Sequence, residues 1–182
     1  MSAPSPRGAG YYLREVNDDE LERLRAFVCD SHVEASGYSP AARAAQIADL
    51  PSDFPDLYCE NTWRARRRPA AWVAVDAIDR TTWVGAVGLK PPASRDGGED
   101  LSYLFVHPSR QRCGIGRALL TVAIDAARAR AAVAIRLLTL PGVYDAALAL
   151  YESAGFVPYR DDEQTPEKLF NLRWLELALS TD

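Results

Sequence analysis

The segment Leu104–Arg117, LFVHPSRQRCGIGR, constrains the fold of this chain more than any other segment. Its apolar start predicts a β-strand that ends near Val106, because Pro108 cannot continue the hydrogen-bond ladder of a sheet. A short loop follows, and the sequence GIG then opens a helix that runs to about Ala131. The first N–H groups of a helix have no intrahelical acceptor, and glycine lets a ligand approach the backbone closely. This order of strand, loop and helix predicts a site for a phosphate or pyrophosphate.

Arginines add positive charge to the same segment, at Arg110, Arg112 and Arg117, with no acidic residue between them. The common phosphate fingerprints do not fit. A dinucleotide-binding turn needs glycine or alanine where this chain has Leu119, and a P-loop needs Gly-Lys-Ser/Thr, whereas Gly116 is followed by Arg-Ala. A plain glycine turn with surface arginines fits the segment as well as an anion site does, so the segment alone does not decide between them.

The remaining pattern predicts a single mixed α/β domain over residues 11–182, after a loose tail at residues 1–10. Strands are expected at 11–16, 71–78, 82–89, 100–106, 134–140 and 168–179, the last with its core at 171–177. Helices are expected from Asn17 to about Glu34 and at 40–50, 114–131 and 144–154.

Composition narrows the class of protein. Hydrophobic residues make up 48% of the 182 residues and charged residues 25%, with a formal net charge of −4, which suits a globular domain and disfavours a nucleic-acid partner. The three cysteines have no metal-ligand spacing and the chain has two histidines, so no metal is expected. The first ten residues contain no apolar signal segment, and no run is long and apolar enough for a membrane span. We therefore expect a cytoplasmic protein with no membrane partner.

Two motifs resemble those of the GCN5-related N-acetyltransferase (GNAT) superfamily. The sequence QRCGIG at 111–116 matches that family's Q/R-x-x-G-x-G/A signature. The sequence LALYESAGF at 148–156 resembles its fourth helix, with a tyrosine four residues before Gly-Phe. The resemblance implies a central mixed, mostly antiparallel sheet of six to seven strands with about four helices on its faces. It also implies that the fourth and fifth strands splay apart, often with the help of a bulge in the fourth.

The resemblance further implies that acetyl-CoA is the co-substrate and that no metal takes part. Its pantetheine arm would lie along the fourth strand and its pyrophosphate in the loop. The implied contacts are Leu104, Phe105 and Val106 for the arm, and Gln111, Arg112, Cys113, Gly114, Ile115, Gly116 and Arg117 for the pyrophosphate. Tyr144 stands where many relatives have an asparagine that contacts the arm, and it is retained as a candidate contact.

By the same resemblance, Tyr151 is the candidate general acid for the departing thiolate, although it also belongs to a helical stripe that a buried aromatic would explain. The candidates for a base or water relay are Asp100 and Ser102, with Glu99 beside them. Many relatives have glutamate where this chain has Asp100 or Ser102, so a direct carboxylate base is in doubt. Strand alternation predicts Asp100, Ser102 and Leu104 on one face, with Glu99, Leu101 and Tyr103 on the other.

The function predicted from these residues is transfer of an acetyl group from acetyl-CoA to a primary amine, by direct attack in a ternary complex. The acceptor is a small amine or a peptide or protein amine, and the protein is a monomer or homodimer. Two alternatives stay open. One is a non-catalytic acyl-CoA-binding sensor or assembly module, which the missing strand glutamate and Tyr144 motivate. The other is a nucleotide-binding protein.

Overall fold

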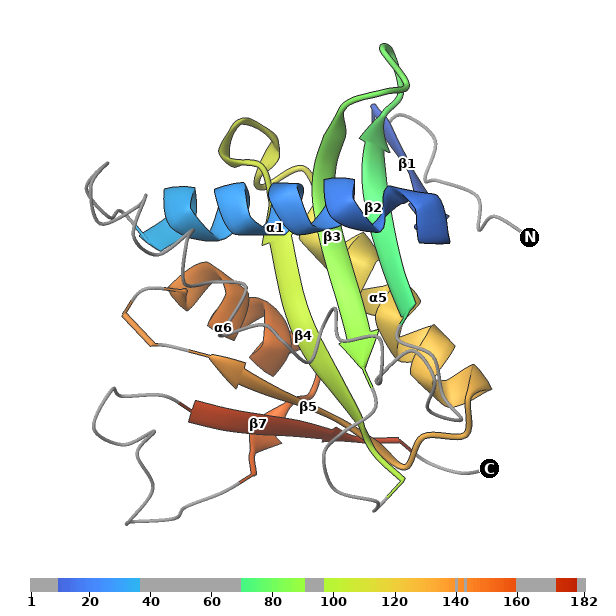
Figure 1. Ribbon diagram of the computed structural model, residues 1–182. Coiled ribbons are helices and arrows are strands. Elements are labelled where there is room, and N and C mark those ends of the chain that lie inside the picture. The colour runs from blue at the N-terminus through green and yellow to red at the C-terminus, as the bar shows by residue number, and fades with distance from the viewer. Residues whose placement is uncertain are drawn as a thin grey trace.

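A seven-stranded sheet forms the centre of the protein (Figure 1). The structure is a computed structural model that describes residues 10–36, 70–90, 97–139, 141–142, 144–159 and 173–179. The strands, labelled as in Figure 1, are β1 (Tyr11–Glu15), β2 (Ala70–Asp76), β3 (Trp83–Lys90), β4 (Glu99–Val106), β5 (Ala134–Thr139), β6 (Val157–Pro158) and β7 (Arg173–Ala178). Their order across the sheet is β1-β2-β3-β4-β5-β7-β6. Every neighbouring pair is antiparallel except β4 and β5, which are parallel.

Helices cover both faces of the sheet (Figure 1). The α-helices of the described residues are α1 (Leu21–Ser36), α5 (Ile115–Ala129) and α6 (Asp145–Ser153), and two 3-10 turns are η1 (Asp18–Glu20) and η2 (Pro108–Arg110). Figure 1 shows α1 crossing one face while α5 runs along the other. The fold class is therefore the predicted one.

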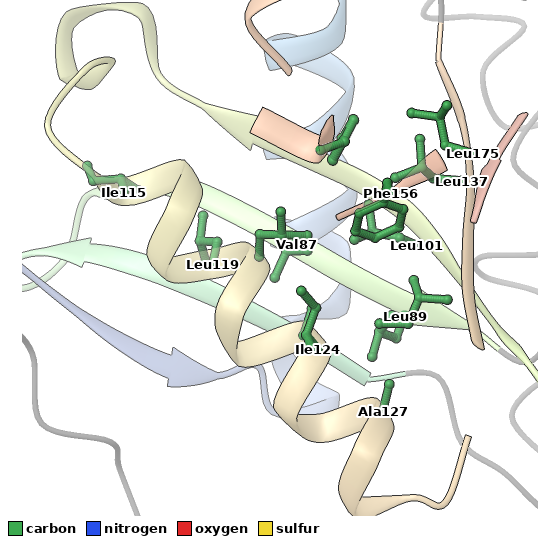
Figure 2. Close-up of a cluster of buried hydrophobic side chains, with 14 of the residues drawn as sticks. Val87, Leu89, Leu101, Ile115, Leu119, Ile124, Ala127, Leu137, Phe156 and Leu175 are labelled. Atoms are coloured by element: carbon green, nitrogen blue, oxygen red, sulfur yellow. The ribbon is translucent and has the colours of Figure 1, made fainter. Parts of the chain in front are cut away.

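Two apolar clusters hold these layers together. The larger lies between the sheet and helices α5 and α6, and Figure 2 shows Leu119, Ile124 and Ala127 of α5 pointing toward Val87 and Leu89 of β3. The smaller cluster lies on the α1 face and contains the buried α1 and β-strand side chains Leu24, Val28, Val73, Val75, Trp83, Ala86 and Tyr103. Because both faces of β3 are covered by apolar side chains, its residues are buried in succession and do not alternate between buried and exposed.

The entry to α1 is anchored by charge. The backbone N–H of Asn17 donates to the Glu20 carboxylate (3.2 Å), and the Arg14 guanidinium donates to both Glu20 oxygens (2.6 Å each). The hydrogen bond from Arg14 lowers the pKa of Glu20 and outweighs the opposing effect of burial. The Arg14 guanidinium also lies over the Trp83 ring, with 5.7 Å to the centroid. The predicted helix start at Asn17 thus becomes a short 3-10 turn followed by α1.

Most predicted elements coincide with observed ones to within about two residues. The last strand begins its described part at Arg173, and the two-residue strand β6 was not predicted. The predicted helix at 40–50 lies outside the described residues. The domain limits of 1–10 and 11–182 stay a prediction. Within the described ranges, no helix has the length and apolar character that crossing a membrane requires.

Candidate active site

Strands β4 and β5 separate soon after they begin. Their register consists of two pairs, Glu99 with Ile135 and Asp100 with Arg136. Beyond these pairs β4 stays bonded to β3 and β5 to β7, and the two strands diverge as Figure 1 shows. Two strand edges thus face each other without a ladder between them, which is an arrangement able to accept an extended ligand by backbone pairing.

A β-bulge at Ser102 accompanies the separation. Gly88 pairs with Tyr103 whereas Leu89 pairs with Leu101, so β4 has one extra residue, Ser102. The Tyr103 ring lies across Gly88, where a Cβ atom would sit 2.5 Å from a ring carbon. A side chain at this position of β3 would therefore displace the buried Tyr103 ring.

The bulge makes the predicted alternation of β4 wrong. Leu101 and Tyr103 were expected on one face, but Leu101 lies in the α5 cluster and Tyr103 in the α1 cluster. Leu104 packs on the same side as Leu101. One inserted residue shifts the phase of a two-residue period, so every side chain after it changes face.

The candidate bases have different surroundings. Glu99 is fully buried, and Arg130 Nε at the end of α5 lies 3.1 Å from its carboxylate, so Glu99 serves the packing where β4 and β5 still pair. Asp100 is half-buried and lies in register between Lys90 of β3 and Arg136 of β5. The Ser102 hydroxyl is occluded and makes no hydrogen bond to a described residue. An unpaired buried hydroxyl is costly, and this one is reached by a water or a substrate group only after the surrounding atoms move.

The loop between β4 and α5 presents backbone donors. Arg112 and Gly114 both have left-handed backbone conformations, with φ of 60° and 80°. The first helical bond runs from Ala118 N–H to Gly114 C=O (3.0 Å). In the described part of the chain the N–H groups of Ile115, Gly116 and Arg117 therefore have no acceptor. A Cβ built on Gly114 meets no atom within 4 Å, so the space above this turn is open.

The loop side chains divide into two groups. Those of Arg112, Cys113 and Arg117 are exposed near the helix start. Those of Arg110 and Gln111 are used within the protein: the Gln111 amide donates to Val106 C=O (3.2 Å), and Arg110 pairs with Asp76 (3.2 Å). Gln111 and Arg110 therefore shape the loop, and sequence inspection did not separate Arg110 from the two exposed arginines.

Helix α6 places Tyr151 beside this region. Gly155, with φ of 93°, ends the helix, and Phe156 N–H donates back to Tyr151 C=O (3.1 Å). The Tyr151 and Phe156 rings lie 5.7 Å apart. Tyr151 is 5% exposed, and its hydroxyl makes no hydrogen bond in the described part of the chain. Burial raises the pKa of the Tyr151 phenol well above its ordinary value. The phenol is therefore a hydrogen-bond donor at neutral pH.

Several predicted residues meet in space. Leu104, Val106, Ile115 and Tyr151 belong to one cluster, and Leu150 of α6 lies 3.3 Å from a Cβ built on Gly116. The Ile115 side chain is core, which leaves its N–H group as the part that faces the loop. The Phe105 side chain packs on the α1 face, away from the others. Tyr144 is half-buried just before α6. The resemblance implied a bulge in the fourth strand, but its position at Ser102 was not predicted, and Leu150 was missed, since neither has a local signal beyond ordinary strand and helix patterns.

Comparison with known proteins agrees with this geometry. The sequence profile of the acetyltransferase (GNAT) family matches residues 38–156. The chain therefore belongs to the acetyltransferase (GNAT) family. No curated protein matches the sequence.

Solved structures resemble the whole fold. The PaiA N-acetyltransferase of Thermoplasma acidophilum, solved with coenzyme A, has a TM-score of 0.68 at 19% identity and covers 93% of this chain and 99% of its own. A GNAT acetyltransferase of Staphylococcus aureus has a TM-score of 0.67 at 17% identity, with the same coverage. The ribosomal-protein-S18-alanine N-acetyltransferase of Escherichia coli has a TM-score of 0.60 at 20% identity and covers 94% and 96%. At these identities the likeness concerns the fold.

Proposed function

We propose that this protein transfers the acetyl group of acetyl-CoA to an amine. The observation that supports it most is the coincidence of two features at the end of β4. The β4–β5 register stops at Asp100–Arg136, and a helix start with acceptor-free N–H groups follows the same strand. An extended pantetheine arm fits the first feature and a pyrophosphate fits the second.

The residues present suit such a co-substrate. Gly114 has a left-handed φ and open space above it, so a bulky anion can approach the backbone at this turn, within the segment Gln111–Arg117. The exposed guanidinium groups of Arg112 and Arg117 add positive charge at the positive end of the α5 dipole. Leu104 and Val106 supply an apolar lining for the arm on the α5 face.

The reaction needs alignment more than covalent catalysis. The neutral amine nitrogen attacks the thioester carbonyl, a C–N bond forms, the C–S bond breaks, and the amine proton leaves to a base or water. Holding both reactants in place can supply several kcal/mol of the barrier. A Tyr151 phenol with a raised pKa is a poor donor of a full proton but a sound hydrogen-bond donor to charge that develops on sulfur.

We propose that a water held by a side chain of β4, and not a carboxylate directly, takes the proton from the amine. Glu99 is excluded as a direct base because it is fully buried beside Arg130 at the paired end of the strands. Ser102 lies at the bulge, and a local movement of β4 that exposes its occluded hydroxyl would let it hold a water that takes the amine proton. Asp100, which lies in the last residue pair of the register, is the second candidate.

The acceptor is proposed only as an amine, with small amines, peptide N-termini and protein lysines as its candidate sources. The acidic residues Asp49, Asp53, Asp56 and Glu60, which would attract a cationic acceptor, lie outside the described residues. A cytoplasmic location and a monomeric or homodimeric state likewise stay predictions.

A thermal-shift screen with acetyl-CoA, longer acyl-CoAs, ATP and NAD tests the function. A ligand at about 100 times its dissociation constant stabilises by about 2.7 kcal/mol, which for a domain of this size raises Tm by roughly 5–10 °C. We expect that shift with acetyl-CoA and not with ATP or NAD. Thiol release from acetyl-CoA is then measured across a panel of amines and peptides. CoA binding without turnover on any amine would favour the acyl-CoA sensor, and protection by ATP or NAD alone would favour the nucleotide-binding alternative.

A further inference from the structure

Arg110 links the loop before α5 to a distant corner of the sheet. Its Nη2 donates to the backbone C=O of Gly10 (2.8 Å) and lies 3.2 Å from Oδ2 of Asp76. The same Gly10 carbonyl accepts the N–H of Ala77 (3.0 Å). These acceptors lie where β1 begins and β2 ends, since Tyr11 pairs with Asp76. A side chain at the end of β4 therefore reaches across to β1 and β2.

The rest of the loop has other anchors. His107 N–H donates to Val84 C=O of β3 (3.0 Å), and the Gln111 side chain donates to Val106 C=O. After these anchors come Arg112 and Cys113, which make no hydrogen bond in the described part of the chain. Arg112 has φ of 60°, a conformation that a non-glycine residue keeps only when its surroundings impose it. The hydrogen-bonded anchors before Arg112 and the buried Ile115 side chain after it therefore hold the loop in shape.

The two carboxylate oxygens of Asp76 have different partners. Oδ1 accepts the N–H groups of Ile78 (2.8 Å) and Asp79 (3.4 Å) in the β2–β3 turn, and Oδ2 faces Arg110. The side chains are partly shielded from solvent, with 16% of Asp76 and 30% of Arg110 exposed. An Asp76→Asn substitution keeps an oxygen for the turn and removes the charge that Arg110 faces. Tyr11 also lies near this corner, where burial and then the nearby Cys113 raise the pKa of its phenol.

We propose that Arg110 is a positioning residue that ties the pyrophosphate loop to the β1–β2 corner and so sets the affinity for the phosphate-bearing part of CoA. The inference rests on the proposed function, because it assumes that the loop binds the pyrophosphate. Arg110 acts through the loop backbone and not by touching the phosphates. The other two arginines, Arg112 and Arg117, are exposed and remain the candidates for direct contact.

The test compares Arg110→Ala, Arg110→Lys, Asp76→Asn and the Arg110→Ala/Asp76→Asn double variant. Arg128→Ala, which removes another arginine from an ion pair on α5, is the matched control. CoA affinity is measured by calorimetry. The specificity constant kcat/KM is measured for acetyl-CoA and for S-acetylpantetheine, which carries the thioester without the pyrophosphate. Far-UV circular dichroism and Tm report the fold.

We expect Arg110→Ala to raise the Kd for CoA about tenfold and Asp76→Asn at least threefold, with Arg110→Lys between the parent and alanine variants. The Kd of the double variant for CoA should exceed that of Arg110→Ala by no more than twofold, because both changes break the same link. The kcat/KM for S-acetylpantetheine should stay within twofold of the parent, as should CoA affinity in Arg128→Ala. If Arg110→Ala does not fold, Arg110→Lys and Asp76→Asn carry the same test.

Three outcomes would overturn the proposal. An Asp76→Asn variant with unchanged or tighter CoA binding would mean that Arg110 does not act through this link. An equal loss with acetyl-CoA and S-acetylpantetheine would mean a general structural role. A parent protein that binds no CoA would overturn the proposed function itself, and the positioning role with it, which distinguishes that failure from the first two.

Discussion

The surroundings of Tyr151 are compatible with both interpretations of its sequence position, the core aromatic and the hydrogen-bond donor. It packs in the α5–α6 cluster beside Phe156, as a core aromatic would. Its hydroxyl nevertheless makes no hydrogen bond in the described part of the chain, although a buried polar group ordinarily finds a partner. A hydroxyl without a protein partner contributes little to stability, and it has the bonding capacity that the proposed role toward the thiolate needs.

Replacement of Tyr151 by phenylalanine separates these roles. Tyr151→Phe should leave Tm within about 2 °C and CoA affinity within twofold, because the ring and its packing remain. It should lower the single-turnover rate of acetyl transfer by roughly ten- to a thousandfold, the range for losing a positioned donor to developing charge. Single-turnover rates are the appropriate measurement because product release can mask the chemical step.

The matched control is Tyr12→Phe, the same change at a half-buried tyrosine of β1 on the α1 side. It should keep the parent's rate. A Tyr151→Phe variant as fast as the parent would reduce Tyr151 to a core aromatic and leave the departing thiolate to a water or to Tyr144.

At the scale of elements, the junction of β4, its loop and α5 was foreseen in outline. Proline after a strand and glycines before a helix act within a few residues, so their effects are visible in a linear sequence. The alternation of β4 was not foreseen. The extra residue at Ser102 depends on how β4 pairs with β3, and no residue in β4 itself announces it.

Gly114→Ala tests the open turn at this junction. Its φ of 80° means that alanine costs roughly 1–2 kcal/mol of stability whether or not a ligand binds there. The added methyl group meets no protein atom, so any further effect arises from the ligand. We expect the Kd for CoA, measured by calorimetry, to rise at least tenfold.

Gly97→Ala is the matched control, because Gly97 has φ of 84° and lies just before the opposite end of β4, where a Cβ makes ordinary contacts with Val133. It should lose similar stability while CoA affinity stays within twofold. Equal affinity losses in both variants, or none in Gly114→Ala, would place the phosphates elsewhere.

On the scale of the whole molecule, the sheet consists of two parts that meet at two residue pairs. Strands β1–β4 form one part, and β5, β7 and β6 form the other. Helices α5 and α6 pack on one shared cluster that contains side chains from both parts, so the larger core joins what the β4–β5 ladder does not (Figure 2). The separated edges can thus stay apart without loss of the fold.

Hydrogen exchange followed by mass spectrometry tests where the ligand lies. Saturating CoA should slow amide exchange in peptides that cover 103–106 and 111–117, because backbone groups of β4 and the loop would bond the arm and the phosphates. Peptides from β2, on the far side of β3, should be unchanged and serve as the internal reference. Protection confined to 111–117 would mean that the arm does not lie along β4.

The amino-acid sequence was sufficient for most of the element order, the glycine-containing loop before α5 and the family, because these depend on local propensity and on two short motifs. Tertiary structure decided matters that depend on distant residues. Arg110 looked like a third phosphate arginine until Gly10 and Asp76 were brought within reach of it. Glu99 looked like a candidate base until Arg130 was placed beside it in a fully buried position. In both cases the partner is at least 31 residues away along the chain, and burial, charge pairing and sheet register are set only once the chain has folded.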